Sequence, residues 1–141
     1  KIAEASAAIS APDYNRLKLY VSDSRSDVRE IGMKMLVERL REQADLASTF
    51  LTDIEEGRLA AHMLDNALAA GMDWDEATLA RIETLLASPQ VELCYAAMAL
   101  LRAPYRAAEV IREQAMKLVK HSDSQIRERA YRILDGAPKS A

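Results

Sequence analysis

Several residue types are scarce in this chain of 141 residues, and each scarcity excludes a class of structure. Cys94 is the only cysteine, so no internal disulfide can form, and we expect a reducing, cytoplasmic compartment. No uncharged apolar run reaches the roughly 18 residues that a membrane-spanning helix needs. Glycine and proline number four each and aromatic residues make up 5%. With abundant Ala, Leu, Arg and Glu, this composition predicts an all-α protein.

The chain begins with Lys1 rather than Met and shows no signal-peptide core. We therefore expect a processed or trimmed chain, for which a longer parent protein is one explanation. Its length suits one domain, residues 1–141, with a sizeable core.

Charge is distributed unevenly around a net value of −3. Residues 1–41 carry eight Lys and Arg against six Asp and Glu, a net +2. Residues 42–101 carry two against eleven, a net −9, and residues 102–141 carry nine against five, a net +4. An acidic centre would repel a nucleic-acid backbone, so we do not expect nucleic acid as a partner.

A leucine recurs with a period in the low thirties, which is typical of helical repeat proteins. Successive spacings are 32, 33 and 33 residues, and the leucines are Leu36, Leu68, Leu101 and Leu134. Apolar spacing and start signals predict helices over 2–10, 12–21, 25–40, 43–53, 55–70, 74–87, 89–102, 105–120 and 123–135. After the first, these helices form four pairs with short links, which predicts antiparallel hairpins.

Polar residues at the expected helix starts support these boundaries. Four of them stand three residues before an acid or amide, as in capping boxes: Ser24, Asp53, Asp73 and Ser122. Pro12, Pro89 and Pro104 suit first helical positions, and Gly71 suits a helix C-terminus.

One face of each second helix carries a repeated apolar stripe. Positions i, i+4, i+7 and i+8 share one side of a helix, and i+8 holds the leucine. Position i+4 is small in three of the four repeats, which lets a neighbouring helix approach closely: Gly32, Ala97 and Ala130. The first helices carry Val21, Leu86 and Val119 at one shared position, where the second pair has Asp53 instead.

These features resemble the HEAT-repeat family of stacked helical hairpins, over about residues 12–135. Asp23 followed by Val28 and Arg29 is the best match to the family pattern, and Ile126 with Arg127 is the next. The resemblance implies a right-handed α-α superhelix, or solenoid, of about four hairpins preceded by an N-terminal helix. It also implies that Asp23 and Arg29 tie neighbouring repeats together, whereas Ala61 and Cys94 replace the arginine elsewhere.

The same resemblance implies a concave surface lined by the second helices, on the sides that the stripe leaves free. That surface would carry Glu30, Met33, Lys34, His62, Asp65, Asn66, Tyr95, Met98, Arg102, Glu128, Tyr131 and Arg132. Methionine and tyrosine among charged side chains suit a protein or peptide partner. The alternative is that Met33, Met98 and the tyrosines pack against adjacent repeats.

Catalytic and metal-binding patterns are not found in the sequence. His62 and Asp65 share a helical face, but no nucleophile accompanies them, and an i,i+3 hydrogen bond is the simpler reading. One Cys and two distant His leave no zinc spacing, so we expect no metal and no cofactor. Cys94 reads as a semi-buried thiol, and Trp74 as a packed side chain or an exposed anchor.

The sequence therefore predicts a non-catalytic scaffold or adaptor domain that binds a protein or peptide on its concave face. The acidic centre favours a basic segment of that partner. Two alternatives follow from the resemblance: a DNA glycosylase of the HEAT-like type, and a chromophore lyase or maturation factor.

Overall fold

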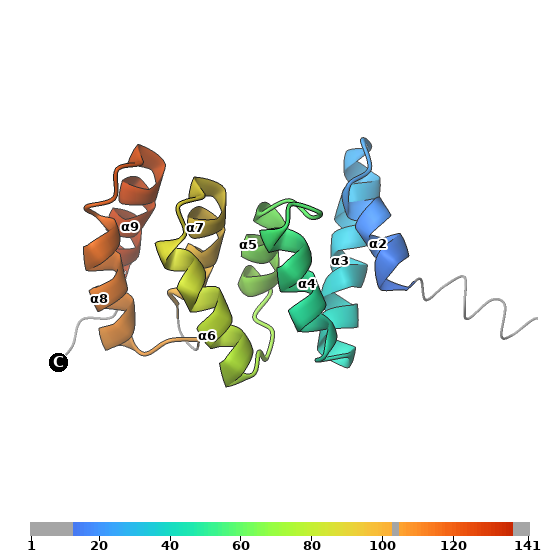
Figure 1. Ribbon diagram of the computed structural model, residues 1–141, viewed down its shortest axis with the longest axis horizontal. Helices are drawn as coiled ribbons and strands as arrows, with labels where there is room; N and C mark the ends of the chain where they lie inside the picture. The colour runs from blue at the N-terminus through green and yellow to red at the C-terminus, as the bar shows by residue number, and fades with distance from the viewer. Residues whose placement is uncertain (1–12, 103–104, 137–141) are drawn as a thin grey trace, which may run out of the picture. The chain divides into compact units, whose positions relative to one another are not determined.

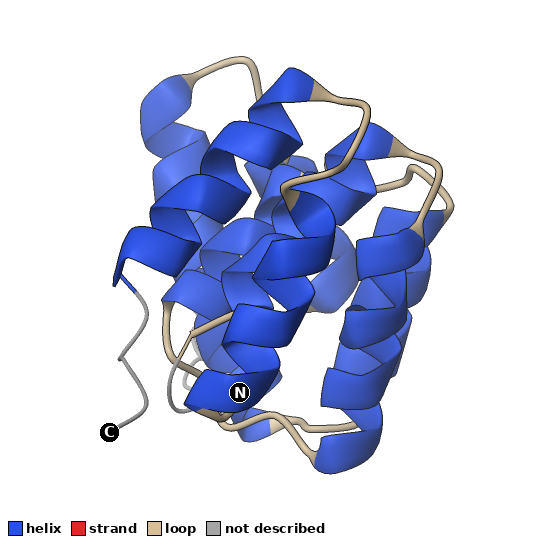
Figure 2. Cartoon of the chain, turned by 90° about the vertical axis from the view of Figure 1, so that its left-hand side faces the viewer, coloured by secondary structure: helices blue, strands red, loops and turns tan. Residues whose placement is uncertain are grey.

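The computed structural model describes residues 13–102 and 105–136. These residues form eight α-helices and two short 3-10 helices and contain no strand (Figure 1, Figure 2), which confirms the all-α prediction. No helix in these ranges is long and apolar enough to cross a membrane. The helix expected over 2–10 lies outside the described residues. The chain divides into two compact units, Lys1–Thr49 and Phe50–Ala141.

Unit 1 contains a helical hairpin of α2 (Tyr14–Val21) and α3 (Ser26–Glu42), followed by the start of α4 (Leu46–Glu55). The carboxylate of Asp13 caps α2 by accepting from the backbone N–H of Arg16 at 2.9 Å. α2 and α3 pack together at Gly32, which is buried. A Cβ at Gly32 would lie 2.7 Å from the Cβ of Tyr20, so only glycine permits this approach.

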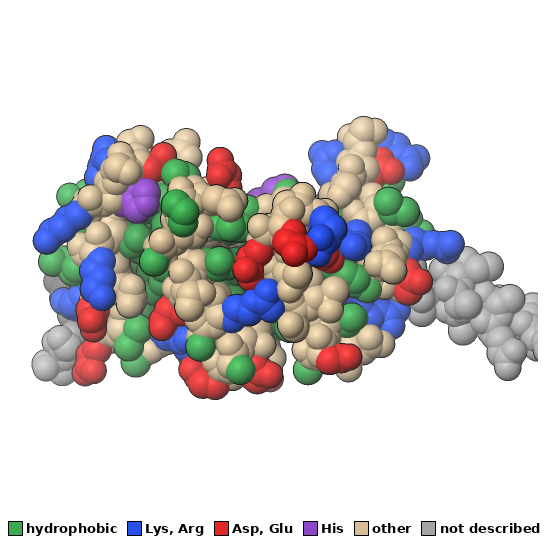
Figure 3. All heavy atoms as spheres, in the orientation of Figure 1, with side chains coloured by type: hydrophobic (Ala, Val, Ile, Leu, Met, Phe, Trp, Pro, Cys, Tyr) green, Lys and Arg blue, Asp and Glu red, His purple; other side chains and the backbone are tan. Residues whose placement is uncertain are grey.

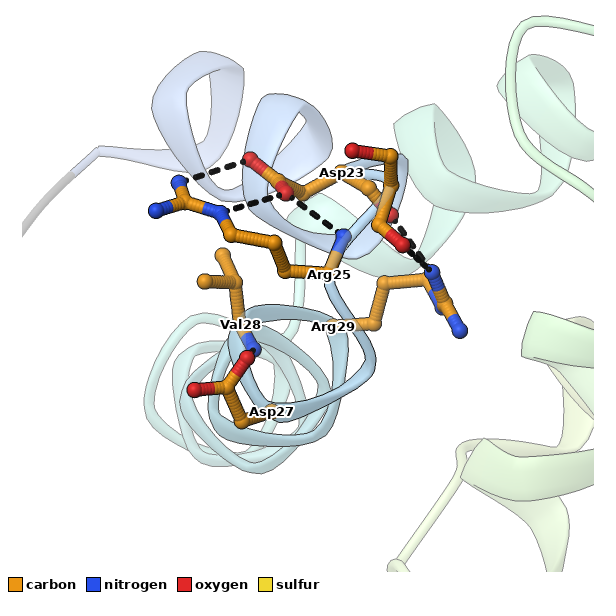
Figure 4. A network of polar contacts seen from close by, with 6 residues as sticks. Asp23, Arg25, Asp27, Val28 and Arg29 are labelled. Carbon is orange, nitrogen blue, oxygen red and sulfur yellow. Dashed lines mark hydrogen bonds and ion pairs between the residues drawn. The ribbon is translucent and has the colours of Figure 1, made fainter.

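The turn between α2 and α3 is held by side-chain contacts to its backbone (Figure 4). Asp23 accepts from the backbone N–H of Arg25 at 2.8 Å and from its guanidinium at 3.0 Å. The guanidinium of Arg29 donates to the carbonyl oxygens of Asp23 and Ser24, each at 2.8 Å. Arg25 thus holds the Asp23 carboxylate, and Arg29 closes the turn of its own hairpin.

Unit 2 contains the end of α4 and the remaining helices. They are α5 (His62–Ala69), α6 (Glu76–Thr84) extended by η1 (Leu85–Ala87), α7 (Val91–Ala97) extended by η2 (Met98–Leu100), α8 (Ala108–Leu118) and α9 (Ser124–Gly136). α6 with η1 packs on α7, α8 packs on α9, and α7 also contacts both α5 and α9 (Figure 1). The second helices α5, α7 and α9 are therefore neighbours in space.

The expected helix over 55–70 is wrong in its first seven residues, because Asp53 does not start it. Asp53 lies inside α4, is 3% exposed, and its Oδ1 accepts from Nε of Arg58 at 2.6 Å. Its carbonyl oxygen also accepts from the backbone N–H groups of Arg58 and Leu59. Gly57, with φ +80°, turns the chain between them, so α5 begins only at His62. Asp53, where the apolar pattern fails, therefore holds the turn between α4 and α5 instead of starting a helix.

Three predicted caps shift by one or two residues, and at two of them a neighbouring carboxylate takes the role. Asp75, not Asp73, caps α6 by accepting from the backbone N–H of Thr78 at 2.7 Å. Hydrogen bonds from the Thr78 side chain and from this N–H lower the pKa of Asp75. Asp123, not Ser122, accepts from the N–H groups at the start of α9. At the start of α3, Arg25 is the N-cap residue and Ser24 makes no capping bond. The predicted C-terminal role of Gly71 is confirmed, with φ +75° just after α5.

The leucine stripe is buried as predicted in three repeats. Leu36, Leu68 and Leu101 are at most 4% exposed, whereas Leu134 is half-buried. The small residues Gly32, Ala97 and Ala130 are buried as well. Position i of the stripe holds Val28, Ala60, Leu93 and Ile126. Leu93 and Ile126 are buried and Val28 is half-buried, whereas Ala60 precedes α5 and is exposed.

Candidate functional site

Arg129 joins the three second helices of unit 2. From α9, its guanidinium donates to both carboxylate oxygens of Asp65 on α5, at 2.9 and 3.2 Å. It also donates to the carbonyl oxygen of Tyr95 on α7 at 2.6 Å, and lies over the ring of Tyr95 at 4.5 Å from its centroid. The Arg129 side chain is 18% exposed, so solvent weakens these contacts little. One side chain thus fixes the spacing of α5, α7 and α9.

A groove of about 390 Å³ lies beside this junction, at the starts of the same three helices. We call it the α5–α7–α9 groove. Its wall combines an imidazole, two carboxylates, an amide, an aromatic ring and aliphatic groups, supplied mainly by His62, Asp65, Val91, Glu92, Tyr95 and Gln125. His62, Glu92 and Gln125 are exposed, whereas Asp65 and Tyr95 are half-buried. Glu92 makes no ion pair with a described residue, which leaves its charge available to a partner.

The groove gathers three of the predicted surface residues: His62, Asp65 and Tyr95. Five others in unit 2 are exposed but do not line it, namely Asn66, Arg102, Glu128, Tyr131 and Arg132. In unit 1, Glu30 and Lys34 are exposed and form an i,i+4 pair at 3.8 Å, and Met33 is half-buried.

Met98 corrects the predicted surface, because it belongs to the core. Its side chain is 1% exposed, within the 3-10 turn η2 that ends the α7 segment. Every residue over 96–101 is buried, so this end of the α7 segment has no exposed side and position 98 cannot face solvent. Met98 is therefore a packed side chain, which was the alternative given for the methionines.

The expected hydrogen bond between His62 and Asp65 is not formed. Asp65 accepts from Arg129 instead, a residue 64 positions away that no local pattern would select. Val91, Glu92 and Gln125 were also missed, although a signal for them existed. Glu92 and Gln125 stand three residues before Tyr95 and Glu128, one helical turn earlier on the same faces.

Two further arginines hold the helices of unit 2 together. Arg81 on α6 donates to Glu55 at 3.0 Å and to the hydroxyl of Thr52 at 2.8 Å, both on α4. Arg106, after η2, donates to Glu83 of α6 at 2.9 Å, and its side chain is 11% exposed. Tyr105 donates its hydroxyl to the carbonyl oxygen of Leu68 at 2.9 Å. These contacts position the helices that form the groove.

The reactive and polar residues outside the groove, including Cys94 and Trp74, are explained by their structural surroundings. Cys94 is buried and donates its thiol to the carbonyl oxygen of Leu86 at 3.3 Å, and burial raises the pKa of this thiol. Trp74 is half-buried, with an indole N–H that finds no acceptor among the described residues. Exposed acidic side chains gather over the start of α6, where Asp73, Asp75 and Glu76 lie (Figure 3). In the described part of the chain, no three His, Cys, Asp or Glu side chains are placed to hold a metal.

The chain matches no protein-family model, and comparisons with curated proteins and with solved structures returned no significant similarity. What the α5–α7–α9 groove does is therefore inferred from its own residues.

Proposed function

We propose that this chain is a non-catalytic protein-binding domain whose helical hairpins form a right-handed, HEAT-like solenoid. The observation that supports it best is the α5–α7–α9 groove, to which three successive second helices each contribute side chains. A surface assembled from equivalent positions of neighbouring repeats is the usual binding surface of such arrays.

The size and openness of the groove favour a short peptide segment as its occupant. A volume of about 390 Å³ accommodates a few side chains rather than a folded domain. Small-molecule sites bury most of their ligand, whereas His62, Glu92 and Gln125 leave this groove open to solvent. Tyr95 supplies a rigid aromatic contact surface beside the aliphatic groups of Val91 and Ala96.

The charge of the groove favours a basic residue in that segment. The Asp65 carboxylate is already paired with Arg129, so Glu92 is the acid that remains for a partner. A lysine or arginine between Glu92 and the Tyr95 ring would gain an ion pair and an aromatic contact. The same acid opposes a phosphate backbone, so we do not propose the DNA glycosylase alternative.

A randomised peptide library displayed on phage, selected against the immobilised chain, tests this proposal. We expect the selected peptides to be enriched in Lys and Arg and to shift the amide resonances of Glu92, Tyr95 and Gln125. Glu92→Lys should weaken their binding about tenfold or more, because an attraction becomes a repulsion. The matched control is Glu38→Lys on α3, an exposed acid outside the groove.

Folding of both variants is checked by circular dichroism. Peptides that bind Glu92→Lys as well as the unchanged chain, or that shift amides elsewhere, would exclude the groove as the binding site.

A further inference from the structure

Asp65 and Tyr95 offer three kinds of contact that together suit a guanidinium group. The Asp65 carboxylate accepts two hydrogen bonds, one from each terminal nitrogen of Arg129, at 2.9 and 3.2 Å. The carbonyl oxygen of Tyr95 accepts another at 2.6 Å, and the centroid of the Tyr95 ring lies 4.5 Å from the guanidinium carbon. A planar fork with a flat face makes all of these contacts at once, whereas an ammonium group cannot.

The groups that accept the guanidinium belong to two helices that pack directly on each other. Asp65 lies on α5 and Tyr95 on α7, and α5 contacts α7. Both residues are half-buried, which limits competition from water and strengthens polar contacts. The site should therefore remain when only the side chain of Arg129 is removed, because neither of its walls belongs to α9.

Arg129 also connects this site to the α5–α7–α9 groove. Asp65 and Tyr95 both line the groove, although Arg129 does not. Gln125 is the residue through which α9 lines the groove, and it stands four positions before Arg129 on the same side of the helix. A guanidinium bound to Asp65 and Tyr95 therefore determines where α9 places Gln125.

We propose that Asp65 and Tyr95 form a guanidinium-binding site, which the chain fills with its own Arg129 and which positions α9 along the groove. The class of ligand is a guanidinium ion with one alkyl substituent. Arg129 is thus a positioning residue, because it acts on the groove through Asp65, Tyr95 and Gln125. Its effect on peptide binding rests on the proposed function, whereas the occupancy of the site does not.

Removing the side chain and adding back the missing group tests the proposal on the full chain. Arg129→Ala lacks the atoms of ethylguanidinium, so this ion is the probe, and ethylammonium is a control of equal charge. We expect Arg129→Ala to shift the amide resonances of Asp65, Tyr95 and Gln125. Ethylguanidinium, well below denaturing concentrations, should return them toward their original positions in a saturable way. Ethylammonium should leave them shifted, since it cannot make the forked contacts.

Two further variants act as controls. Arg132→Ala removes an exposed arginine from the same helix and should not respond to ethylguanidinium. Arg129→Lys keeps the charge without the fork, so its resonances should stay shifted as in Arg129→Ala. Where circular dichroism shows that Arg129→Ala does not fold, ethylguanidinium should restore its helicity and ethylammonium should not. Equal responses to the two ions, or resonances that do not change when Arg129 is lost, would overturn the site.

Peptide binding is measured separately, with the peptides that phage display selects. We expect Arg129→Ala to bind them about tenfold more weakly and ethylguanidinium to restore the affinity, because a binding surface depends on the residues that hold it. Unchanged binding by Arg129→Ala would overturn the positioning role. Failure of the groove itself is distinguishable, because Glu92→Lys would then bind these peptides normally with Arg129 in place.

Discussion

Arg29 and Arg127 make the same pair of contacts in two different hairpins. Each donates one guanidinium nitrogen to the carbonyl oxygens six and five residues earlier, at 2.8 and 2.8 Å for Arg29 and 2.7 and 2.8 Å for Arg127. These carbonyls lie in the turn just before α3 or α9. The two arginines occupy equivalent positions in the repeat, and each satisfies backbone acceptors that the helix geometry leaves unpaired.

Arg127→Ala should therefore destabilise unit 2. Two charge-assisted hydrogen bonds are lost together, and we expect a decrease of about 2 kcal/mol in the free energy of unfolding, measured in urea. Arg132→Ala, an exposed arginine on the same helix, is the control and should change it by less than about 0.5 kcal/mol. Equal effects of the two changes would show that the turn contacts of Arg127 contribute nothing.

Gly32→Ala should destabilise the α2–α3 hairpin, although alanine normally favours a helix. The added Cβ would meet the Cβ of Tyr20 at 2.7 Å and backbone atoms at 3.2 Å, which cannot move without separating the helices. We expect a loss of about 1–3 kcal/mol in urea unfolding. Gly136→Ala is the control, since no atom lies within 4 Å of its added Cβ. A stabilising effect of Gly32→Ala would contradict the close helix approach.

Asp53→Ala should be more damaging than Asp53→Asn. The carboxylate of Asp53 is buried and paired with Arg58, and Arg58 is also paired with Glu56. The Arg58 side chain is 52% exposed, so water can solvate its guanidinium charge when Asp53 is lost. We expect about 3 kcal/mol of destabilisation for alanine and a smaller loss for asparagine, which still accepts a hydrogen bond. Thermal unfolding of both variants compares the two losses of stability. A larger loss for Asp53→Asn than for Asp53→Ala would contradict the prediction.

The sequence predicted the helices well where local chemistry determines them, and failed where distant contacts do. Leucine spacing located the buried sides of α3 and α5 and the buried residue Leu101 just after η2, because periodicity reflects burial directly. The start of α5 was wrong because Asp53 resembles a capping residue in sequence. Its carboxylate is instead buried within α4, where it accepts a hydrogen bond from Arg58.

The candidate site was predicted only in part for the same reason. His62, Asp65 and Tyr95 could be chosen from helix geometry alone. Arg129 could not, because 64 residues separate it from Asp65 and no periodic signal connects them. Met98 was placed on the surface because a helix with one exposed side was expected there, whereas all residues over 96–101 are buried.

The Asp23 carboxyl should titrate well below an ordinary aspartate. Its hydrogen bonds from the side chain and backbone of Arg25 lower its pKa from 3.8 to about 2. Because the folded-state pKa is the lower one, Asp23 stabilises the fold above pH 3.8, and this contribution is lost as the pH falls through about 2. NMR titration of its side-chain carbon measures the midpoint. Arg25→Ala should move the midpoint back toward 3.8, and an unchanged midpoint would exclude Arg25 as the cause.

Cys94 should react with thiol reagents only when the fold opens. Its sulfur is buried and hydrogen-bonded to Leu86, and burial raises its pKa, so little thiolate is exposed in the native state. We expect the rate of modification by a disulfide reagent to become independent of reagent concentration, as opening becomes limiting. Rapid modification proportional to reagent concentration in the native state would contradict the burial of Cys94.

The arginine contacts also imply an order of events during folding. Arg29 and Arg127 reach carbonyls five and six residues away, so the α2–α3 and α8–α9 hairpins can close as soon as their own short segments meet. Arg81, Arg106 and Arg129 reach partners 23 to 64 residues away, and bringing such segments together costs more chain entropy. The α8–α9 hairpin should thus be an early nucleus within unit 2, whereas α5, α7 and α9 acquire their final spacing last.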